Sequence, residues 1–164
     1  MFLISPLIGL LFGLLLVSSM DYELHTSYDV DFEDYLIENL QKATESIDAF
    51  IYKFKSDTIY ELLDQKGKDG VYFRLICDVN EAWSEDQYCQ KFSKYGEVVP
   101  FKSKEFDKLH AKSILIDKQL LLIGSNNLDK SSINDNMEIM AAINDTSMAT
   151  TFESIFNTVF NDMN

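Results

Sequence analysis

The chain has 164 residues, which is enough for one domain with one core and too few for two comfortable ones. Apolar residues make up 46% and charged residues 25%, which excludes a disordered chain, a collagen-like chain and a multi-span membrane protein. Fourteen basic residues against 27 acidic ones give a net charge of -13, which argues against tight non-specific binding of nucleic acid by the whole surface.

The first twenty residues are set apart by their apolar character. Residues 2–19 carry no charge and reach the lower length limit of a membrane-spanning helix. Val17 and Ser19 also stand where small residues precede a signal cleavage site. Residues 1–20 are therefore a signal peptide or a membrane anchor, with a buried core helix as the third alternative. The protein is accordingly expected to be exported or membrane-anchored, and it contacts the membrane through residues 2–19 if they are not cleaved.

Residues 21–30 have the composition of a polar linker, and residues 31–164 then alternate between helical and strand patterns. Helices are expected at 31–46, 57–70, 84–96 and 146–160, and strands at 48–54, 71–78, 97–101, 113–116, 120–123 and 137–143. Pro100 indicates that the strand containing it lies at a sheet edge. Several strands are apolar on both faces, which predicts an α/β domain whose sheet is covered by helices on both sides.

Two cysteines and two histidines limit the metal chemistry. No Cys-x-x-Cys or Cys/His ligand spacing is present, so no metal site and no cofactor are expected. Cys77 and Cys89 fit small core residues, and an oxidising compartment would also allow them to pair; the sequence leaves both open.

One segment carries a specific chemical pattern. His110, Lys112, Asp117, Gly124, Ser125 and Asn127 follow the spacing H-x-K-x4-D-x6-G-S-x-N, and Asn136-Met137-Glu138 comes shortly after. His110 and Lys112 lie two apart at the start of a strand and point to the same face. A turn at Asp117-Lys118 returns the chain, so an imidazole, an ammonium, a hydroxyl and an amide converge at one sheet edge. Gly124 would allow a close approach of the backbone.

This segment resembles the HKD motif of the phospholipase D superfamily, and with one motif copy the chain is similar to the minimal bacterial endonuclease and mitochondrial cardiolipin hydrolase/Zucchini-type members. The resemblance implies a phospholipase D-like mixed β-sheet with helices on both faces. It also implies metal-independent phosphodiester cleavage. The chain departs from relatives at Leu128, where many have an aromatic residue, and it lacks the Cys/His insert of some Zucchini-type proteins.

The resemblance also implies roles for individual residues. The catalytic set would be His110, Lys112, Asp117, Asn127 and Glu138, with Lys112, Ser125 and Asn127 binding the phosphate oxygens. His110 would become a covalent phosphohistidine, and Glu138 would hydrogen-bond and orient its imidazole. Asp117 lies an odd number of residues from His110 at a turn, which favours a bracing role over substrate contact. The non-catalytic alternatives are that His110 is a surface histidine at a strand edge and that Glu138 is an exposed carboxylate in an edge strand.

The mechanism needs a second imidazole to protonate the leaving group, and the other histidine, His25, has no lysine two residues on. The expected assembly is therefore a homodimer that brings two HKD motifs together. The substrate is expected to be DNA or RNA, with a cardiolipin-like phospholipid as the first alternative and an inactive phosphate-binding scaffold as the second.

A basic island interrupts the acidic chain between residues 91 and 118. Seven lysines stand there against four carboxylates, a net of +3. Lys102, Lys104 and Lys108 are either a solvated loop face or a rim that steers phosphates. Phe54, Phe101 and Phe106 are expected in the core, and they would serve as a base-stacking platform only if exposed.

Overall fold

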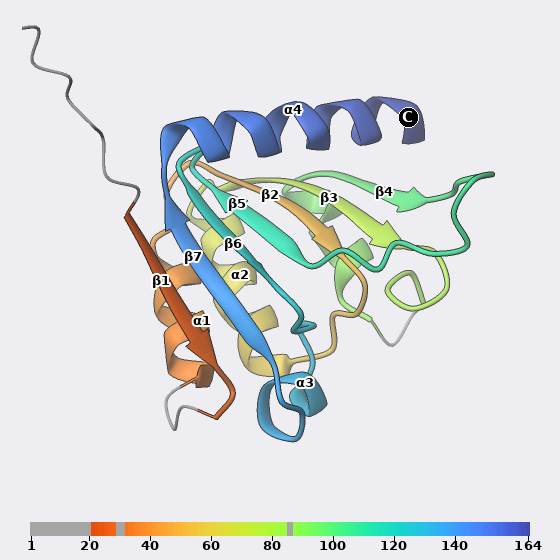
Figure 1. Ribbon diagram of the computed structural model, residues 1–164. Helices are drawn as coiled ribbons and strands as arrows, with labels where there is room; N and C mark the ends of the chain where they lie inside the picture. Colours follow the sequence, from red (N-terminus) through yellow and green to blue (C-terminus); the bar gives the residue numbers. More distant parts are fainter. Residues whose placement is uncertain (1–20, 29–31, 85–86) are drawn as a thin grey trace, which may run out of the picture.

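The computed structural model describes residues 21–28, 32–84 and 87–164. Seven strands form one mixed sheet in the order β1-β7-β6-β5-β2-β3-β4 (Figure 1). The strands are β1 (Asp21–Thr26), β2 (Ser46–Ile51), β3 (Tyr72–Asp78), β4 (Gly96–Phe101), β5 (Ser113–Ile116), β6 (Leu120–Gly124) and β7 (Ile139–Asn144). The helices are α1 (Phe32–Gln41), α2 (Asp57–Lys68), the 3-10 helix η1 (Cys89–Lys94), α3 (Lys130–Asn134) and α4 (Thr146–Met163). The predicted segment at 1–20 lies outside the described residues, and no described helix is long and apolar enough to cross a membrane.

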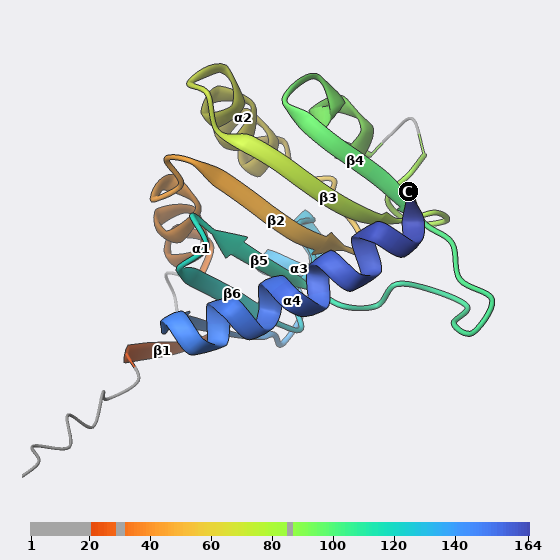
Figure 2. The same ribbon diagram turned by 90° about the horizontal axis from the view of Figure 1, so that it is seen from above.

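Helices cover both faces of the sheet, as the doubly apolar strands predicted. Helix α4 runs across one face, and α1 and α2 lie against the other (Figures 1 and 2). The core is accordingly split in two: Leu36, Ile59 and Phe73 belong to the α1/α2 side, and Leu115 and Phe156 to the α4 side. β2, β3 and β4 are mutually parallel, and all other pairs are antiparallel. β4 is an edge strand, which confirms the expectation from Pro100.

Two predicted segments are wrong. The expected linker at 21–30 begins with β1, which pairs with β7 along its whole length. Its alternation was hidden because it is an edge strand with mostly exposed side chains, including Tyr22 and Leu24. The expected helix over 84–96 is only the six-residue η1. Cys89, its first residue, is bonded to Cys77 of β3, and the described residues just before it, Gln87 and Tyr88, form a bend and not a helix.

A buried ion pair fastens α4 to the sheet. Asp48 and Arg74 are direct neighbours on β2 and β3, and the guanidinium contacts both carboxylate oxygens, with Nε 2.7 Å from Oδ1. The same guanidinium donates to Asn157 of α4 at 2.8 Å and lies 5.1 Å from the ring centroid of Phe156. Only 3% of the Asp48 side chain is exposed. The pair therefore connects two strands and a helix through one cation.

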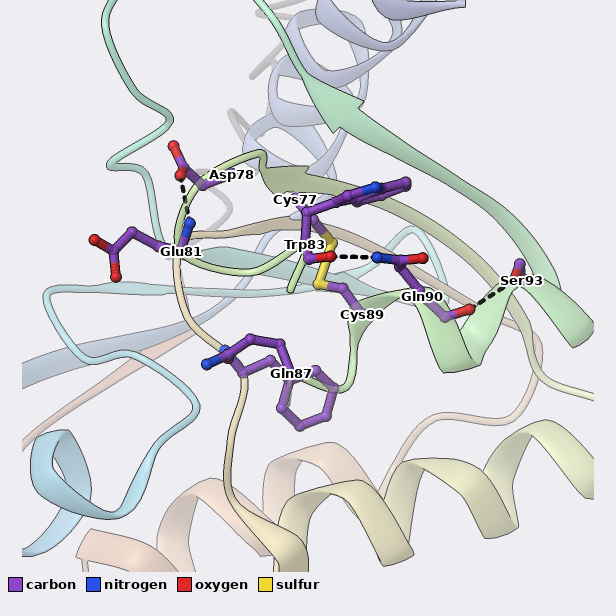
Figure 3. Close-up of a disulfide and its surroundings, with 9 residues drawn as sticks. Cys77, Asp78, Glu81, Trp83, Gln87, Cys89, Gln90 and Ser93 are labelled. Atoms are coloured by element: carbon purple, nitrogen blue, oxygen red, sulfur yellow. Dashed lines mark hydrogen bonds between the residues drawn. A yellow bond between two sulfur atoms is a disulfide. The ribbon is translucent and has the colours of Figure 1, made fainter. Parts of the chain in front are cut away.

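A disulfide joins Cys77, at the end of β3, to Cys89 (Figure 3). Both residues are completely buried, so each is also a core residue. The bridge holds the start of η1 at the end of β3. Asp78 fixes the start of that segment by accepting the backbone N–H groups of Asn80 and Glu81, each at 2.9 Å.

Candidate active site

The carboxyl ends of β2 and β3 meet the start of β5 and the end of β6 at one edge of the sheet. His110 and Lys112 immediately precede β5, and Ser125 and Asn127 follow β6. Lys112, Gly124 and Asn127 line one pocket together with Tyr52 and Lys53, which follow β2. The structure therefore brings most of the predicted motif to one edge, where parallel strands meet antiparallel ones.

The His110 ring lies on the surface against Tyr52, with the ring centroids 4.6 Å apart and the planes at 57°. Partial removal from water, followed by the charges of Lys112 and Lys108, lowers the pKa of His110 below its usual value, and Asp78 opposes that shift. The imidazole is consequently neutral at neutral pH, which is the form that can attack an electrophile.

Lys112 is half-buried beside it. Its Nζ donates to the backbone oxygen of His110 at 2.7 Å and lies 4.5 Å from the ring centroid of Tyr52. Burial lowers the pKa of Lys112, the charge of Glu138 opposes this, and Lys108 and Lys53 add to the lowering. Two further ammonium groups, on Lys53 and Lys108, lie 5.7 and 5.8 Å from the same ring. Tyr52 thus sits at the centre of three cations and the imidazole.

Glu138 differs from both expectations made for it. It is 8% exposed and lies just before β7, which is not an edge strand, so it is not a surface carboxylate. Its carboxylate accepts from the Ser125 hydroxyl and from Asn136 Nδ2 at 3.3 Å, and not from His110. Its backbone N–H donates to the hydroxyl of Ser27 at 2.7 Å. Glu138 is therefore held beside the motif by Ser125, while the imidazole packs on Tyr52.

Gly124 allows a close approach, and the partner is the neighbouring strand. A Cβ at this position would lie 2.2 Å from the carbonyl oxygen of Ile139. The backbone N–H of Ser125 donates to that same oxygen at 3.0 Å, and Ile139 N donates to the Ser125 hydroxyl at 3.2 Å. Glycine thus lets β6 and β7 come close enough for Ser125 to reach Glu138.

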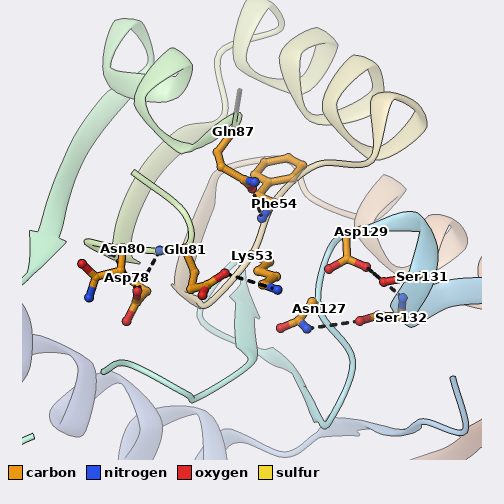
Figure 4. Close-up of polar contacts among 10 residues, drawn as sticks. All are labelled: Lys53, Phe54, Asp78, Asn80, Glu81, Gln87, Asn127, Asp129, Ser131 and Ser132. Carbon is orange, nitrogen blue, oxygen red and sulfur yellow. Dashed lines mark hydrogen bonds and ion pairs between the residues drawn. The ribbon is translucent and has the colours of Figure 1, made fainter. Parts of the chain in front are cut away.

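The half-buried side chain of Asn127 lines the same pocket. Its Nδ2 donates to the Ser132 hydroxyl at 3.1 Å, and its Oδ1 is buried without a hydrogen-bond donor. Rotating the amide by half a turn would let Ser132 donate to Oδ1 and would turn the NH₂ group toward the pocket. Asn127 and Ser132 belong to a segment fixed by Asp129, the N-cap of α3 (Figure 4).

Asp117, which the family pattern placed in the catalytic set, lies away from the site. It lies at the far end of β5 from His110, in the β5–β6 turn, where it and Lys118 have positive φ angles of 51° and 55°. Its carboxylate accepts four hydrogen bonds of 2.7–2.9 Å, from the backbone N–H groups of Thr44, Glu45 and Ser46 and from the Thr44 hydroxyl. Asp117 therefore braces the α1–β2 connection, as its place at a turn indicated, and it is not part of the site.

Replacing Asp117 with asparagine is expected to lower the free energy of unfolding by about 1–2 kcal/mol at pH 7, because one acceptor for backbone N–H groups is lost. Burial raises the pKa of Asp117, but the hydrogen bonds from Ser46, Glu45 and Thr44 outweigh it, so the folded pKa is lowered. This stabilisation is complete above the unfolded pKa of about 3.9 and is lost as the pH falls through the folded value. Urea unfolding at pH 7 and near pH 3 measures it: the gap between wild type and variant should shrink at the lower pH. Glu45→Gln, an exposed neighbour, is the control, and an equal gap at both pH values would contradict the assignment.

Three residues at the site carry no motif signal. Tyr52 and Lys53 follow a buried strand, and Asp78 ends the next one. Asp78 accepts the backbone N–H of Leu109 at 2.8 Å and so fixes the residue before His110. Lys53 pairs with Glu81 at 3.2 Å and lies between Glu81 and the Asn127 segment (Figure 4). Their position directly after parallel strands was the available signal. Within the described ranges, no cluster of three or more His, Cys, Asp or Glu side chains could hold a metal ion.

Comparisons with known proteins identify relatives of this domain. The family model for "Cardiolipin synthase, PLD-like domain" matches residues 36–160. A mitochondrial cardiolipin hydrolase from Chlamydomonas reinhardtii is 26% identical over 121 residues, which cover 74% of this chain and 54% of that relative. The chain thus spans about half the length of this curated relative.

Two solved structures share the fold. NucT from Helicobacter pylori superposes with a TM-score of 0.75 at 20% identity, covering 87% of this chain and 97% of that one. Nuc from Salmonella typhimurium, a phospholipase D family member, gives 0.74 at 19% identity, covering 87% and 95%. At these identities the likeness shows the fold alone.

Proposed function

Because the chain belongs to the family of phospholipase D-like domains, we propose that it is a phosphodiesterase in which His110 forms a covalent phosphohistidine, and that its substrate is DNA or RNA. The observation that carries this proposal is the surface imidazole of lowered pKa beside the ammonium of Lys112. A neutral imidazole supplies the nucleophile. The ammonium groups around Tyr52 supply the positive charge that a phosphoryl group needs in its transition state.

The reaction has two balanced steps. An unprotonated nitrogen of His110 attacks phosphorus, an N–P bond forms, and the P–O bond to the leaving alkoxide breaks as an imidazolium gives that oxygen a proton. Water then attacks phosphorus, gives its proton to the imidazole formed in the first step, and breaks the N–P bond. Lys112 and Asn127 hold the non-bridging oxygens. Ser125 donates to Glu138 and so acts through that carboxylate, whose charge sustains the protonated form of Lys112.

The second imidazole is proposed to come from a second copy of the chain. His25 on β1 pairs with Met140 on β7, and Met140 pairs with Gly124 on β6, whose N–H donates to the carbonyl oxygen of Lys112. Three strand spacings, on the order of 14 Å, separate His25 from Lys112. The His25 ring also stacks on Tyr35 at 3.9 Å. His25 is thus too far away to serve His110.

An uncovered apolar face next to the site suits that second copy. Leu24, Ile123 and Ile139 point to the same side of β1, β6 and β7 as Leu121 and Ile143, but beyond the part of the sheet that packs on α4. All three are exposed, as is Met137. This face adjoins Ser125 and Glu138, so a partner that covers it would approach the motif. A homodimer would bury the face and complete the site together.

Two observations support an exported or membrane-anchored protein. Residues 2–19 are uncharged in the sequence, and Cys77 and Cys89 form a disulfide. Disulfides persist in oxidising compartments and are rare in reducing ones. The second candidate substrate, a cardiolipin-like phospholipid, is favoured by the cardiolipin hydrolase among the relatives.

The test uses the full chain in detergent and EDTA. It is given three substrates in parallel: labelled single-stranded DNA, labelled RNA and cardiolipin vesicles. Cleavage of DNA or RNA that persists in EDTA is expected, because lysines replace the metal ion. Loss of nucleic-acid cleavage in EDTA would overturn the metal-independent mechanism. Cleavage of cardiolipin alone would replace the nuclease by the lipid hydrolase. A folded dimer inactive on all three would indicate the phosphate-binding scaffold.

A further inference from the structure

We propose that the loop between β4 and β5 is a docking surface for unpaired nucleobases, with Phe106 as the stacking platform and the surrounding lysines as phosphate contacts. The proposal rests on the proposed phosphodiesterase function of His110. It goes further by assigning a surface outside the motif and by predicting discrimination between single and double strands.

The loop holds Phe106 out in the solvent in a defined position. The loop is buried at both ends, at Phe101 and at Leu109. Leu109 is fixed by Asp78 at 2.8 Å, and the Ser103 hydroxyl accepts the backbone N–H groups of Glu105 and Phe106 at 3.0 and 3.2 Å. Phe106 is nevertheless 64% exposed. The aromatic ring is thus presented by a fixed turn between two buried anchors.

This exposure overturns the expectation from the sequence that Phe106 belongs to the core. Phe54 and Phe101, for which the same expectation was made, are 1% and 9% exposed, as predicted. One exposed phenylalanine is by itself ordinary on a protein surface. Phe106 differs because Lys104 and Lys108 lie two residues away on either side of it, and Lys108 contacts the ring on which His110 packs.

Three exposed lysines flank Phe106 in the loop that leads to His110. Lys102, Lys104 and Lys108 are exposed, and in the part of the chain that the structure describes none of them pairs with a carboxylate. Lys108 reaches back to the Tyr52 ring, on which His110 packs. Lys108, two residues after Phe106, therefore connects this loop to the ring on which the nucleophile packs. Aromatic rings that alternate with cations are the usual means of binding single strands, because bases stack on the rings and phosphates contact the cations.

The flanking residues favour nucleic acid over a lipid surface. Phe106 stands between Glu105 and Asp107, both exposed. Insertion of the ring into an anionic bilayer would carry two carboxylates into the headgroup region, where they are repelled. A base that stacks on the face of the ring leaves both carboxylates in water. Bases in a duplex are already stacked on each other, so Phe106 can engage only unpaired ones.

The experiment compares the full-length wild type with Phe106→Ala and Phe106→Tyr on four substrates: a labelled single strand, the same strand in a duplex, bis(4-nitrophenyl) phosphate and cardiolipin vesicles. Phe106→Ala is expected to lower kcat/KM on the single strand about tenfold, mainly through KM, because one stacked base is lost. Phe106→Tyr should restore it. Cleavage of the duplex and of the small diester should not change. Tyr72→Ala removes an exposed aromatic at the amino end of β3, away from the site, and should leave all four rates unchanged.

Each other result has a distinct meaning. Unchanged cleavage of the single strand by Phe106→Ala would overturn the docking surface and leave the nuclease standing. Equal losses on the single strand and on the small diester would show a distorted site and overturn the stacking role. A loss confined to cardiolipin vesicles would assign the loop to lipid. If the wild type cleaves no nucleic acid, the nuclease fails, and the docking surface fails with it.

Discussion

Replacing His110 with asparagine is expected to reduce turnover by about 10⁴-fold or more, because the nucleophile is removed outright. Asparagine is polar and of similar reach, and the His110 side chain is exposed, so the fold should persist. Steady-state rates on a single strand measure the loss. Mass spectrometry of the intact wild-type chain, after the reaction is quenched under alkaline conditions, should show a phosphoryl adduct that the variant lacks.

The same variant tests whether two chains share one site. If each active unit needs His110 from both chains, unfolding and refolding an equal mixture of wild type and variant should leave about one quarter of the activity, the fraction of all-wild-type dimers. Independent sites would leave about one half. Lys118→Gln, an exposed lysine in the turn at the other end of β5, is the control and should leave the rate unchanged. A residual rate near one half would contradict the shared site.

Replacing Asp48 with alanine is expected to lower the free energy of unfolding by about 3–5 kcal/mol, because it leaves the Arg74 guanidinium in a largely buried position without its anion. For a chain of this length, that loss corresponds to a decrease in Tm of about 6–20 °C. Calorimetry or thermal melting followed by circular dichroism measures it.

The double variant Asp48→Leu/Arg74→Met distinguishes the cost of an unpaired buried charge from the contribution of the ion pair itself. It removes both charges and keeps the apolar contacts with Phe156 and Phe160, so its stability should lie close to that of the wild type. Lys130→Ala, which removes an exposed ion pair with Asp57 at 3.9 Å, should change the Tm little. A double variant as unstable as Asp48→Ala would show that the pair is needed for more than mutual neutralisation.

The sequence predicted the interior of the fold better than its edges. β2, β3 and β5 are largely buried on both faces, and strands that are mostly apolar on both faces are easy to recognise. β1 was not predicted as a strand because its side chains are mostly exposed and because it depends on pairing with β7, more than 110 residues away. The helix expected over 84–96 failed because the disulfide between Cys77 and Cys89, which the sequence left open, fixes that segment from outside it.

The site, too, was only partly predictable from the sequence. His110, Lys112, Ser125 and Asn127 stand on adjacent strand ends, so their spacing alone placed them at one edge. The support from Tyr52 and Asp78 depends on which strands end at that edge, and this is a property of the sheet order. The contact expected between Glu138 and His110 came from the family pattern. In this chain Ser125 takes that carboxylate instead.

The pairing of β1 with β7 also sets an order of events during synthesis. β1 is the first described strand to leave the ribosome, but its partner is made more than 110 residues later. At about 5–20 residues per second, that delay is on the order of ten seconds. During this time strands β2 to β6 can already pair among themselves. When β7 arrives and β1 docks, Ser27 closes on the backbone of Glu138 at both its N–H and its carbonyl. Docking of β1 therefore also fixes the backbone of the residue whose carboxylate lies beside the catalytic motif.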